Sequence, residues 1–382
     1  MKPRARSSAT RSSASATRAI GSTTTLADRK RRAGQRLVVG FHGVDAPDSL
    51  RELCAEVQPA GFILFARNVE EPAQVRELNR QLSSLLPAEL PPLLSVDQEG
   101  GRVQRIKATE WPRARWVGNV DDVAQTRALA RAMGDELRSL GFHVDWAPVA
   151  DVDSNPKNPV IGDRAFSDRP QVVARHVTAF LAGLEEAGIA GCVKHFPGHG
   201  DTTVDSHLDL PIVEKEPPEL ERCELVPFRA AIQAGAPLVM TAHVSFPAWD
   251  EVHPATMSSA VLRGVLRERL GFQGVLVSDD LEMKAVRGRY PLELQLELAS
   301  RATVDLFLCC SEVELQWEAF EVLVRLQEQD KAHHDIAVDA FARLRALRHR
   351  LLAAPPPMPQ PSVVGSIIHR DLAMGLQARG RA

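Results

Sequence analysis

Short apolar runs alternate with longer amphipathic stretches from residue 37 to residue 352. The runs are four to six residues long, and most lack alternation of apolar and polar positions. Unbroken apolarity of this kind is typical of strands that are buried on both faces of a parallel sheet. The pattern predicts eight strands, at residues 37–41, 61–65, 92–96, 143–148, 189–193, 238–241, 274–277 and 304–308.

The intervening stretches place apolar residues at intervals of three and four, which is the spacing of one face of an α-helix. A glycine stands just before several of the predicted strands, at Gly141, Gly188, Gly235 and Gly271, and indicates the end of the preceding helix. Helices are therefore predicted at residues 49–57, 72–86, 120–140, 171–187, 219–234, 258–270 and 292–302, and around 336–352.

Eight strands alternating with helices predict an α/β protein with a single-domain (β/α)8 barrel of the TIM type. A doubly wound open sheet is the alternative, but eight units suit barrel closure better. The first strand is not followed by the glycine-rich turn that dinucleotide binding requires. We expect the barrel at residues 35–354, a disordered basic extension at 1–34 and a proline-rich tail at 355–382.

Charge is distributed unevenly along the 382 residues. Residues 1–34 hold nine Lys or Arg and one acid, a net charge of +8, so the remainder carries −11 of the total of −3. The extension is rich in Ser, Thr, Ala and Arg and lacks the apolar core of a secretory signal. Its composition is that of a transit peptide, but a disordered tail or a misassigned start codon is the simpler interpretation.

The acidic body argues against a nucleic-acid partner, because phosphate backbones call for a basic face. The five cysteines are odd in number, lack metal-ligand spacing and fall mostly in apolar runs. This usage is typical of buried thiols in a reducing compartment. The chain also lacks an apolar stretch near the roughly 18–20 residues of a membrane span. We therefore expect a cytoplasmic monomer with neither a membrane partner nor a cofactor.

Ionisable residues gather where the predicted strands end, whereas the strand bodies hold few of them. Active sites of barrels of this type lie at the C-terminal ends of the strands. This asymmetry indicates an enzyme. The residues at or near these ends are His42, Arg67, Asp97, Asp151, Lys194, His195, His243 and Asp279.

The densest group is the stretch 194–207, KHFPGHGDTTVDSH, which follows the fifth strand. It contains three histidines, two aspartates and a lysine. Loops held by a rigid scaffold carry catalytic groups more often than other surface does. The stretch is therefore the leading candidate for the catalytic loop.

A metal hydrolase of the amidohydrolase type is one reaction class that these groups allow. Such barrels usually have a His-x-His on the first strand and an aspartate after the eighth. Here the first strand ends in His42 alone and the eighth in Cys309 and Cys310. The candidate ligands in this chain are His195, His199, His207 and His243.

A Schiff-base aldolase using Lys194 is the second class. It requires an apolar pocket that lowers the pKa of the lysine. Lys194 is instead flanked by His195 and is expected to face acids such as Asp97, which keep it charged. A non-catalytic binding barrel is a further alternative, but it would not need both His207 and Asp279.

Glycoside hydrolysis is the third class and fits the residues best. It needs a carboxylate nucleophile, an acid/base group and polar side chains for sugar hydroxyls. Asp279 provides the nucleophile, and His207 can transfer the proton. Since side chains alternate along a strand, Asp279 is expected to share the direction of Val277, and Asp280 to point the other way. The candidate sugar-binding residues are Asp97, Arg105, Arg164, Lys194 and His195.

Four blocks of the chain resemble family 3 glycoside hydrolases of the β-N-acetylglucosaminidase (NagZ-like) type. KHFPGHGDTTVDSH at 194–207 resembles the family signature, and its DSH triplet distinguishes this branch from the β-glucosidases. VDQEGGRVQR at 96–105, VIGDRAF at 160–166 and VSDDLEM at 277–283 are similar to its other blocks, in the same order. The resemblance covers roughly residues 36–350. It departs from the family at Ala165, where a serine is common.

The resemblance implies a retaining mechanism through a covalent glycosyl-enzyme. It also implies release of N-acetylglucosamine from muropeptides, small carbohydrate substrates of peptidoglycan (cell-wall) recycling. Matched by motif, Asp279 is the nucleophile and His207 is the acid/base, oriented by Asp205. The five sugar-binding candidates also match family positions. A β-glucosidase or an N-acetylglucosaminide phosphorylase of the same family is the alternative.

Overall fold

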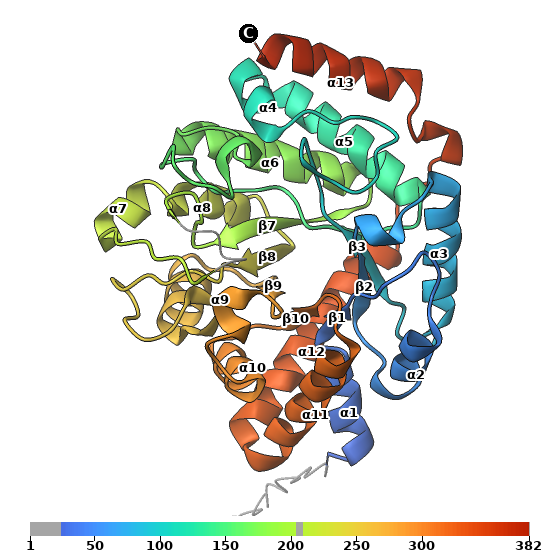
Figure 1. Cartoon of the computed structure of the whole chain (residues 1–382), viewed down its shortest axis with the longest axis vertical. Helices are drawn as coiled ribbons and strands as arrows, with labels where there is room; N and C mark the ends of the chain where they lie inside the picture. Colours follow the sequence, from blue (N-terminus) through green and yellow to red (C-terminus); the bar gives the residue numbers. More distant parts are fainter. Residues whose placement is uncertain (1–23, 204–208, 382) are drawn as a thin grey trace, which may run out of the picture.

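The computed structural model describes residues 24–203 and 209–381, and its central feature is a closed barrel of eight parallel strands (Figure 1). The barrel closes because β1 pairs with β2 on one side and with β10 on the other. The predicted (β/α)8 barrel is confirmed. Its strands are β1 (Leu37–Val39), β2 (Gly61–Leu64), β3 (Leu93–Val96), β6 (Val144–Asp145), β7 (Ala190–Phe196), β8 (Leu238–Thr241), β9 (Val275–Asp280) and β10 (Leu306–Cys309).

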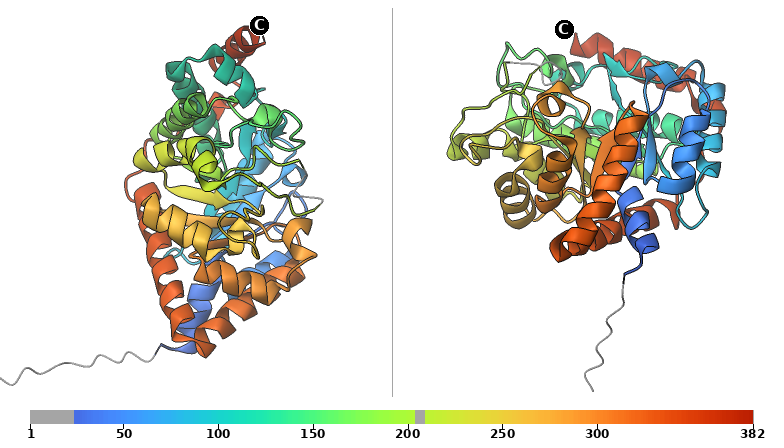
Figure 2. Two further views of the ribbon diagram at one scale, coloured as in Figure 1. Left: turned by 90° about the vertical axis from the view of Figure 1, so that its left-hand side faces the viewer. Right: turned by 60° about the horizontal axis from the view of Figure 1, so that its bottom comes forward.

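Helices surround the strands in all views (Figures 1 and 2). They are α2 (Asp48–Val57), α3 (Pro72–Ser84), α4 (Ala114–Val120), α5 (Val123–Ser139), α6 (Pro170–Glu186), α7 (Pro217–Arg222), α8 (Leu225–Gln233), α9 (Lys284–Arg287), α10 (Leu292–Arg301), α11 (Val313–Gln329) and α12 (Lys331–Leu352). The predicted stretch 258–270 forms a π-helix at Ala260–Arg269. The sequence patterns had indicated no element for α11. Among the described residues, there is no helix long and apolar enough to cross a membrane.

The strands are buried on both faces, as their unbroken apolarity predicted. Val275 and Val277 belong to the cluster that fills the barrel interior, while Leu276 between them belongs to the outer cluster under the helices. Leu344 and Leu347 of α12 join the interior cluster and close the barrel at the N-terminal ends of the strands. Each fully buried side chain of this size contributes about 1.5–3 kcal/mol through removal from water.

A short antiparallel hairpin follows β3 and was not predicted. Its strands are β4 (Gln98–Gly100) and β5 (Val103–Gln104). The turn uses Gly100 and Gly101, both with positive φ, and a Cβ on Gly100 would lie 2.4 Å from a backbone oxygen of Pro112. Only glycine fits this turn without strain. The hairpin places the segment after β3 over the C-terminal ends of the barrel strands.

The end of the predicted basic extension is ordered, which corrects the expectation of disorder at residues 26–34. Leu26–Gly34 form helix α1, and Thr25 and Asp28 cap it reciprocally. The helix packs against α11 and α12. Its buried residues are small, Ala33 and Gly34, so composition did not indicate a packed element. Residues 1–23 lie outside the described part of the chain.

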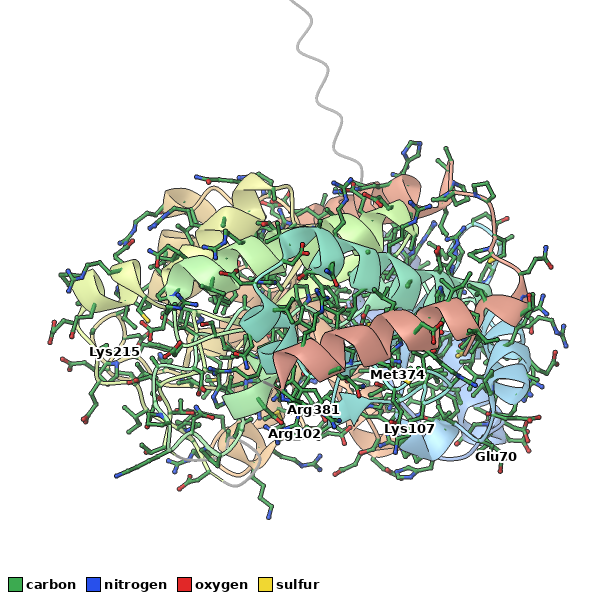
Figure 3. All side chains as sticks on the ribbon, turned by 90° about the horizontal axis from the view of Figure 1, so that it is seen from above. Glu70, Arg102, Lys107, Lys215, Met374 and Arg381 are labelled. Carbon is green, nitrogen blue, oxygen red and sulfur yellow. The ribbon has the colours of Figure 1, made fainter. Side chains whose placement is uncertain are left out.

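The proline-rich tail also contains an unpredicted helix, α13 (Ile367–Gly380), after a 3₁₀ turn at Pro361–Val363. This helix lies against α4 and α5, on the outer side of the molecule (Figure 1). Figure 3 looks onto it, with Met374 and Arg381 labelled. The prolines at 355–357 do follow the end of α12, as expected.

The contact of this tail with the body centres on the buried carboxylate of Glu136 in α5. Its Oε1 accepts hydrogen bonds from Thr109 Oγ1 at 2.6 Å and from the amide of Gly365 at 2.9 Å. The same oxygen lies 2.9 Å from Nδ1 of His369. Residues 365–369 are thereby joined to the segment that follows the hairpin.

Candidate active site

A pocket of about 220 Å³ lies at the C-terminal ends of the barrel strands, where the sequence predicted the active site. Asp205 and His207 fall within residues 204–208, outside the described part of the chain. Six of the eight predicted site residues line the pocket, namely Asp97, Arg105, Arg164, Lys194, His195 and Asp279.

The remaining strand-end residues do not all belong to this pocket. His42 is exposed, and Arg67 donates from Nε to the carbonyl of Phe41 at 2.9 Å. Another hollow, of about 280 Å³, lies at the opposite end of the barrel and is lined mainly by small and apolar residues. Its charged residues, Glu185 and Arg350, pair with each other. Of these two hollows, the one at the C-terminal ends of the strands combines acids, cations and histidines.

Asp279 occupies the end of β9, and the inward direction of Val275 and Val277 carries it into the pocket, as predicted. Its Oδ1 accepts a hydrogen bond of 2.8 Å from the amide of Asp280. Burial alone would raise the pKa of this carboxyl, but the neighbouring His195 and His243 more than offset that and lower it. Asp279 is therefore anionic, as a carboxylate nucleophile must be.

Asp280 has a different environment, although it lines the same pocket. The strand ends at this residue, and its Oδ1 accepts from the amide of Glu282 at 3.1 Å, so alternation does not turn it fully away. Burial and the nearby charge of Glu282 raise the pKa of Asp280 to about 7. The two adjacent carboxyls thus differ in charge at neutral pH.

Acids and cations alternate along the opposite wall of the pocket. Lys194 Nζ lies 2.7 Å from Asp97 Oδ1 and 2.7 Å from Glu99 Oε1. Arg164 binds Glu99 through two parallel hydrogen bonds of 2.8 Å, from Nε and NH2. Arg105 NH2 lies 3.4 Å from Asp97 Oδ2. Such charge-assisted bonds fix the direction of each side chain.

The network keeps Lys194 protonated. Burial would lower the pKa of its amine, but Asp97 and Glu99 raise it above the ordinary value. The predicted contact with Asp97 is confirmed, and the geometry opposes an amine nucleophile of the aldolase type. Lys194 is instead a fixed hydrogen-bond donor at the wall of the pocket.

Two histidines of the catalytic loop are held by Asp151, which is fully buried after β6. Asp151 Oδ2 lies 2.7 Å from Nδ1 of His195, and its Oδ1 accepts from the amide of His199 at 2.7 Å. The contact at Nδ1 leaves the Nε2 of His195 for the pocket. Nδ1 of His199 in turn lies 2.9 Å from Thr202 Oγ1, and burial lowers the pKa of His199 to about 4.

His243 is also committed to protein partners. Its Nδ1 lies 2.9 Å from Thr256 Oγ1, and its Nε2 lies 3.0 Å from the carbonyl oxygen of Asp280. Burial lowers the pKa of this imidazole. The three described histidines that had been considered as metal ligands, His195, His199 and His243, thus each contact a protein oxygen through Nδ1.

The flanks of the undescribed residues are tied together. Lys215 Nζ lies 2.9 Å from Asp201 Oδ1 and 2.6 Å from Oε1 of the buried Glu224. The side-chain Nδ2 of Asn155 donates to the backbone carbonyl of Asp201 at 3.1 Å. Asp201 and Lys215, on the two sides of residues 204–208, are therefore in direct contact.

Sequence reasoning missed Glu99 and Asp145 as parts of this site. Glu99 lies inside the block 96–105, two residues after Asp97, which was the available signal. Asp145 lies at the end of β6 below the pocket, where its Oδ1 accepts from the amide of Gln98 at 2.9 Å. Burial raises the pKa of Asp145 well above the ordinary value, which favours its protonated form.

Comparison with known proteins places this geometry in a family. The model of the glycosyl hydrolase family 3 N-terminal domain matches residues 31–344. The chain is 40% identical over 299 residues to a β-hexosaminidase of Nitrosomonas eutropha, covering 74% of this chain and 84% of that protein. It is 35% identical over 336 residues to β-hexosaminidase A of Pseudoalteromonas piscicida, covering 80% of this chain. It spans only 56% of the length of that second relative.

A solved structure agrees with the sequence matches. A family 3 β-N-acetylglucosaminidase from Paenibacillus sp. superposes with a TM-score of 0.85 at 38% identity, covering 92% of this chain and 68% of that one. The resemblance seen in the four sequence blocks is confirmed.

Proposed function

Since the chain belongs to glycosyl hydrolase family 3, we propose that it is a retaining β-N-acetylhexosaminidase that releases terminal N-acetylglucosamine from β-linked glycans. The observation that carries this proposal is the position of Asp279. Its half-buried anionic carboxylate lies in a pocket whose other wall presents fixed hydrogen-bonding groups. This arrangement suits attack on a sugar carbon rather than binding alone.

In the first step, Asp279 attacks the anomeric carbon while the bond to the leaving oxygen breaks. The amide of Asp280 holds Oδ1, so Oδ2 is the oxygen that attacks. A proton from the acid/base group goes to the leaving oxygen. In the second step, water attacks the glycosyl-enzyme, gives its proton to the same group and restores the carboxylate. Two inversions at the anomeric carbon retain its configuration.

We assign the acid/base role to His207 and its orientation to Asp205, on the strength of the DSH triplet. A free imidazole has a pKa near ~6.5, so a carboxylate partner is needed to favour the protonated form at neutral pH. On the two sides of this segment, Asp201 and Lys215 lie 2.9 Å apart.

The sugar is bound by the wall opposite Asp279. Lys194, Arg105 and Arg164 are donors toward its hydroxyls, Asp97 is an acceptor, and His195 contributes through Nε2. The natural substrate that we propose is a muropeptide of peptidoglycan recycling, taken by a cytoplasmic monomer that needs no cofactor. The family resemblance supports the substrate, and the mostly buried free cysteines support the reducing compartment.

The test is a parallel assay of the purified protein on 4-nitrophenyl N-acetyl-β-glucosaminide and 4-nitrophenyl β-glucoside. Faster hydrolysis of the first, with β-N-acetylglucosamine as the first-formed anomer, supports the proposal. Preference for the glucoside, or release of the α-anomer, would overturn it. Addition of phosphate separates a hydrolase from a phosphorylase, since a phosphorylase would form the sugar 1-phosphate.

A further inference from the structure

Glu99 connects three separate parts of the site. It lies on β4 of the hairpin, whereas Arg164 lies on the 3₁₀ turn Gly162–Arg164 and Lys194 lies on β7. The side chains of Glu99, Arg164 and Lys194 are 5%, 11% and 3% exposed, so this contact is nearly removed from water. A single carboxylate therefore contacts both cations, with Asp97 as the second partner of Lys194.

The oxygens of Glu99 are already used within the protein. Oε1 accepts from Lys194 Nζ and from Arg164 NH2, and Oε2 accepts from Arg164 Nε. Burial would raise the pKa of this carboxyl, but the two cations hold it well below its usual range. Glu99 is thus a permanent anion whose bonding capacity is largely spent on Lys194 and Arg164.

The pocket is balanced in charge because of this residue. Its lining has three cations, Arg105, Arg164 and Lys194, facing the three acids Asp97, Glu99 and Asp279. Asp280, whose pKa is raised by burial to about 7, is only partly ionised at neutral pH. Without Glu99, the acids would number one fewer than the cations, and the excess positive charge would lie at Lys194 and Arg164.

We propose that Glu99 is a positioning residue that aims Lys194 and Arg164 at the hydroxyls of an uncharged hexosamine and, by neutralising them, excludes anionic sugars. This inference rests on the proposed function, because it concerns how the same pocket selects its sugar. Buried donors with a fixed geometry favour a neutral hydroxyl, whereas unbalanced cations favour phosphate, sulfate or carboxylate groups.

Two variants separate the two parts of the proposal, which are the aiming of Lys194 and Arg164 and the neutralisation of their charge. Glu99→Gln keeps the size of the side chain but removes its charge. Glu99→Asp keeps the charge but shortens the side chain, so that the parallel hydrogen bonds to Arg164 cannot all form. Glu110→Gln is the matched control, since Glu110 is exposed on the segment that follows the hairpin and does not line the pocket.

The experiment measures inhibition of the wild type and the three variants by N-acetylglucosamine and by inorganic sulfate, with sulfate binding also followed by calorimetry without substrate. Thermal melting checks that each variant is folded. In Glu99→Gln, the inhibition constant for N-acetylglucosamine should rise roughly tenfold and that for sulfate should fall by a similar factor. In Glu99→Asp, only the constant for N-acetylglucosamine should rise, and the control should match the wild type.

If Glu99→Gln binds both N-acetylglucosamine and sulfate more weakly than the wild type, Glu99 has a merely structural role and the proposal is overturned. Unchanged constants for both would overturn it as well. If Glu99→Gln does not fold, Glu99→Asp provides the test. An unaltered affinity of Glu99→Asp for N-acetylglucosamine would then overturn the proposal. Failure of the proposed function is distinguishable, since it would appear as a wild type without glycosidase activity, while sulfate calorimetry would still report on the charge of Glu99.

Discussion

The amide of Asp280 donates a hydrogen bond of 2.8 Å to Oδ1 of Asp279, so the chain itself orients the carboxylate before it. The same two neighbours differ in protonation, because His195 and His243 lower the pKa of Asp279 while burial raises that of Asp280 to about 7. One strand end thus presents an anion next to a carboxyl that is largely neutral below pH 7. This difference makes the assignment of the nucleophile testable.

A 5-fluoro glycosyl fluoride of N-acetylglucosamine is expected to trap a covalent adduct on Asp279, because its carboxylate is ionised while Asp97 and Glu99 are paired with Lys194. Peptide mass spectrometry identifies the labelled residue. Asp280→Asn should still be labelled, whereas Asp279→Asn should not. An adduct on Asp280 would contradict the mechanism.

The loss of rate on removing the acid/base dyad should depend on the leaving group of the substrate. His207→Ala is expected to lose about 10²–10⁴ in rate on a natural disaccharide and to retain more of the glycosylation rate on a nitrophenyl glycoside, which needs less protonation. Asp205→Ala should follow the same pattern. The double variant should be little slower than His207→Ala, and additive losses measured by steady-state kinetics would rule out a joint action.

The stability of Asp145→Asn relative to the wild type should increase as pH rises. The unfolded carboxyl ionises near pH ~3.9, whereas burial keeps the native one protonated. Above that pH the native state therefore binds more protons than the unfolded state, and the wild type loses up to about 1.4 kcal/mol per pH unit until the native pKa is reached. Asparagine is neutral in both states. Urea unfolding of both proteins at pH 4, 5.5 and 7 gives the difference, and a constant difference would show that Asp145 is ionised.

Two N-terminal truncations should behave differently. A chain starting at Thr24 is expected to keep kcat/KM within about twofold, roughly 0.4 kcal/mol, and to keep its Tm. A chain starting at Gly34 loses α1 and its contacts with α11 and α12, so its Tm should fall by at least about 2 °C. Calorimetry of the two proteins checks this. Equal Tm values would mean that α1 contributes nothing to stability.

The sequence predicted the barrel well because its strands are buried on both faces. Runs such as residues 37–39 leave no ambiguity between apolar and polar sides, and each of the eight became a barrel strand. The position of the site followed from the same fact, since Asp97, Lys194 and Asp279 directly end apolar runs. Four of the five cysteines are buried, as their apolar neighbours indicated.

The remainder depended on contacts that local patterns do not encode. The pairing of Glu99 with Arg164 joins residues 65 positions apart through a hairpin that was not recognised. Helix α13 buries His369, Ala373, Leu376 and Gly380, a stripe with a single large apolar residue, so its periodicity is weak. Asp280 lines the pocket, although it was expected to point away from Asp279. The strand β9 ends at this residue, so side chains no longer alternate strictly between its two faces.

The attachment of α13 also bears on the order in which the molecule assembles. His369 meets Glu136 across 233 positions of sequence, and Gln377 donates to the carbonyl of Glu110 across 267. The pairing of Leu37 with Phe307 that closes the barrel spans a comparable 270 positions. Because the entropic cost of closing a loop rises only slowly with its length, the two events have similar costs. A newly synthesised chain can therefore complete neither the barrel nor the α13 contacts until nearly all of it has been made.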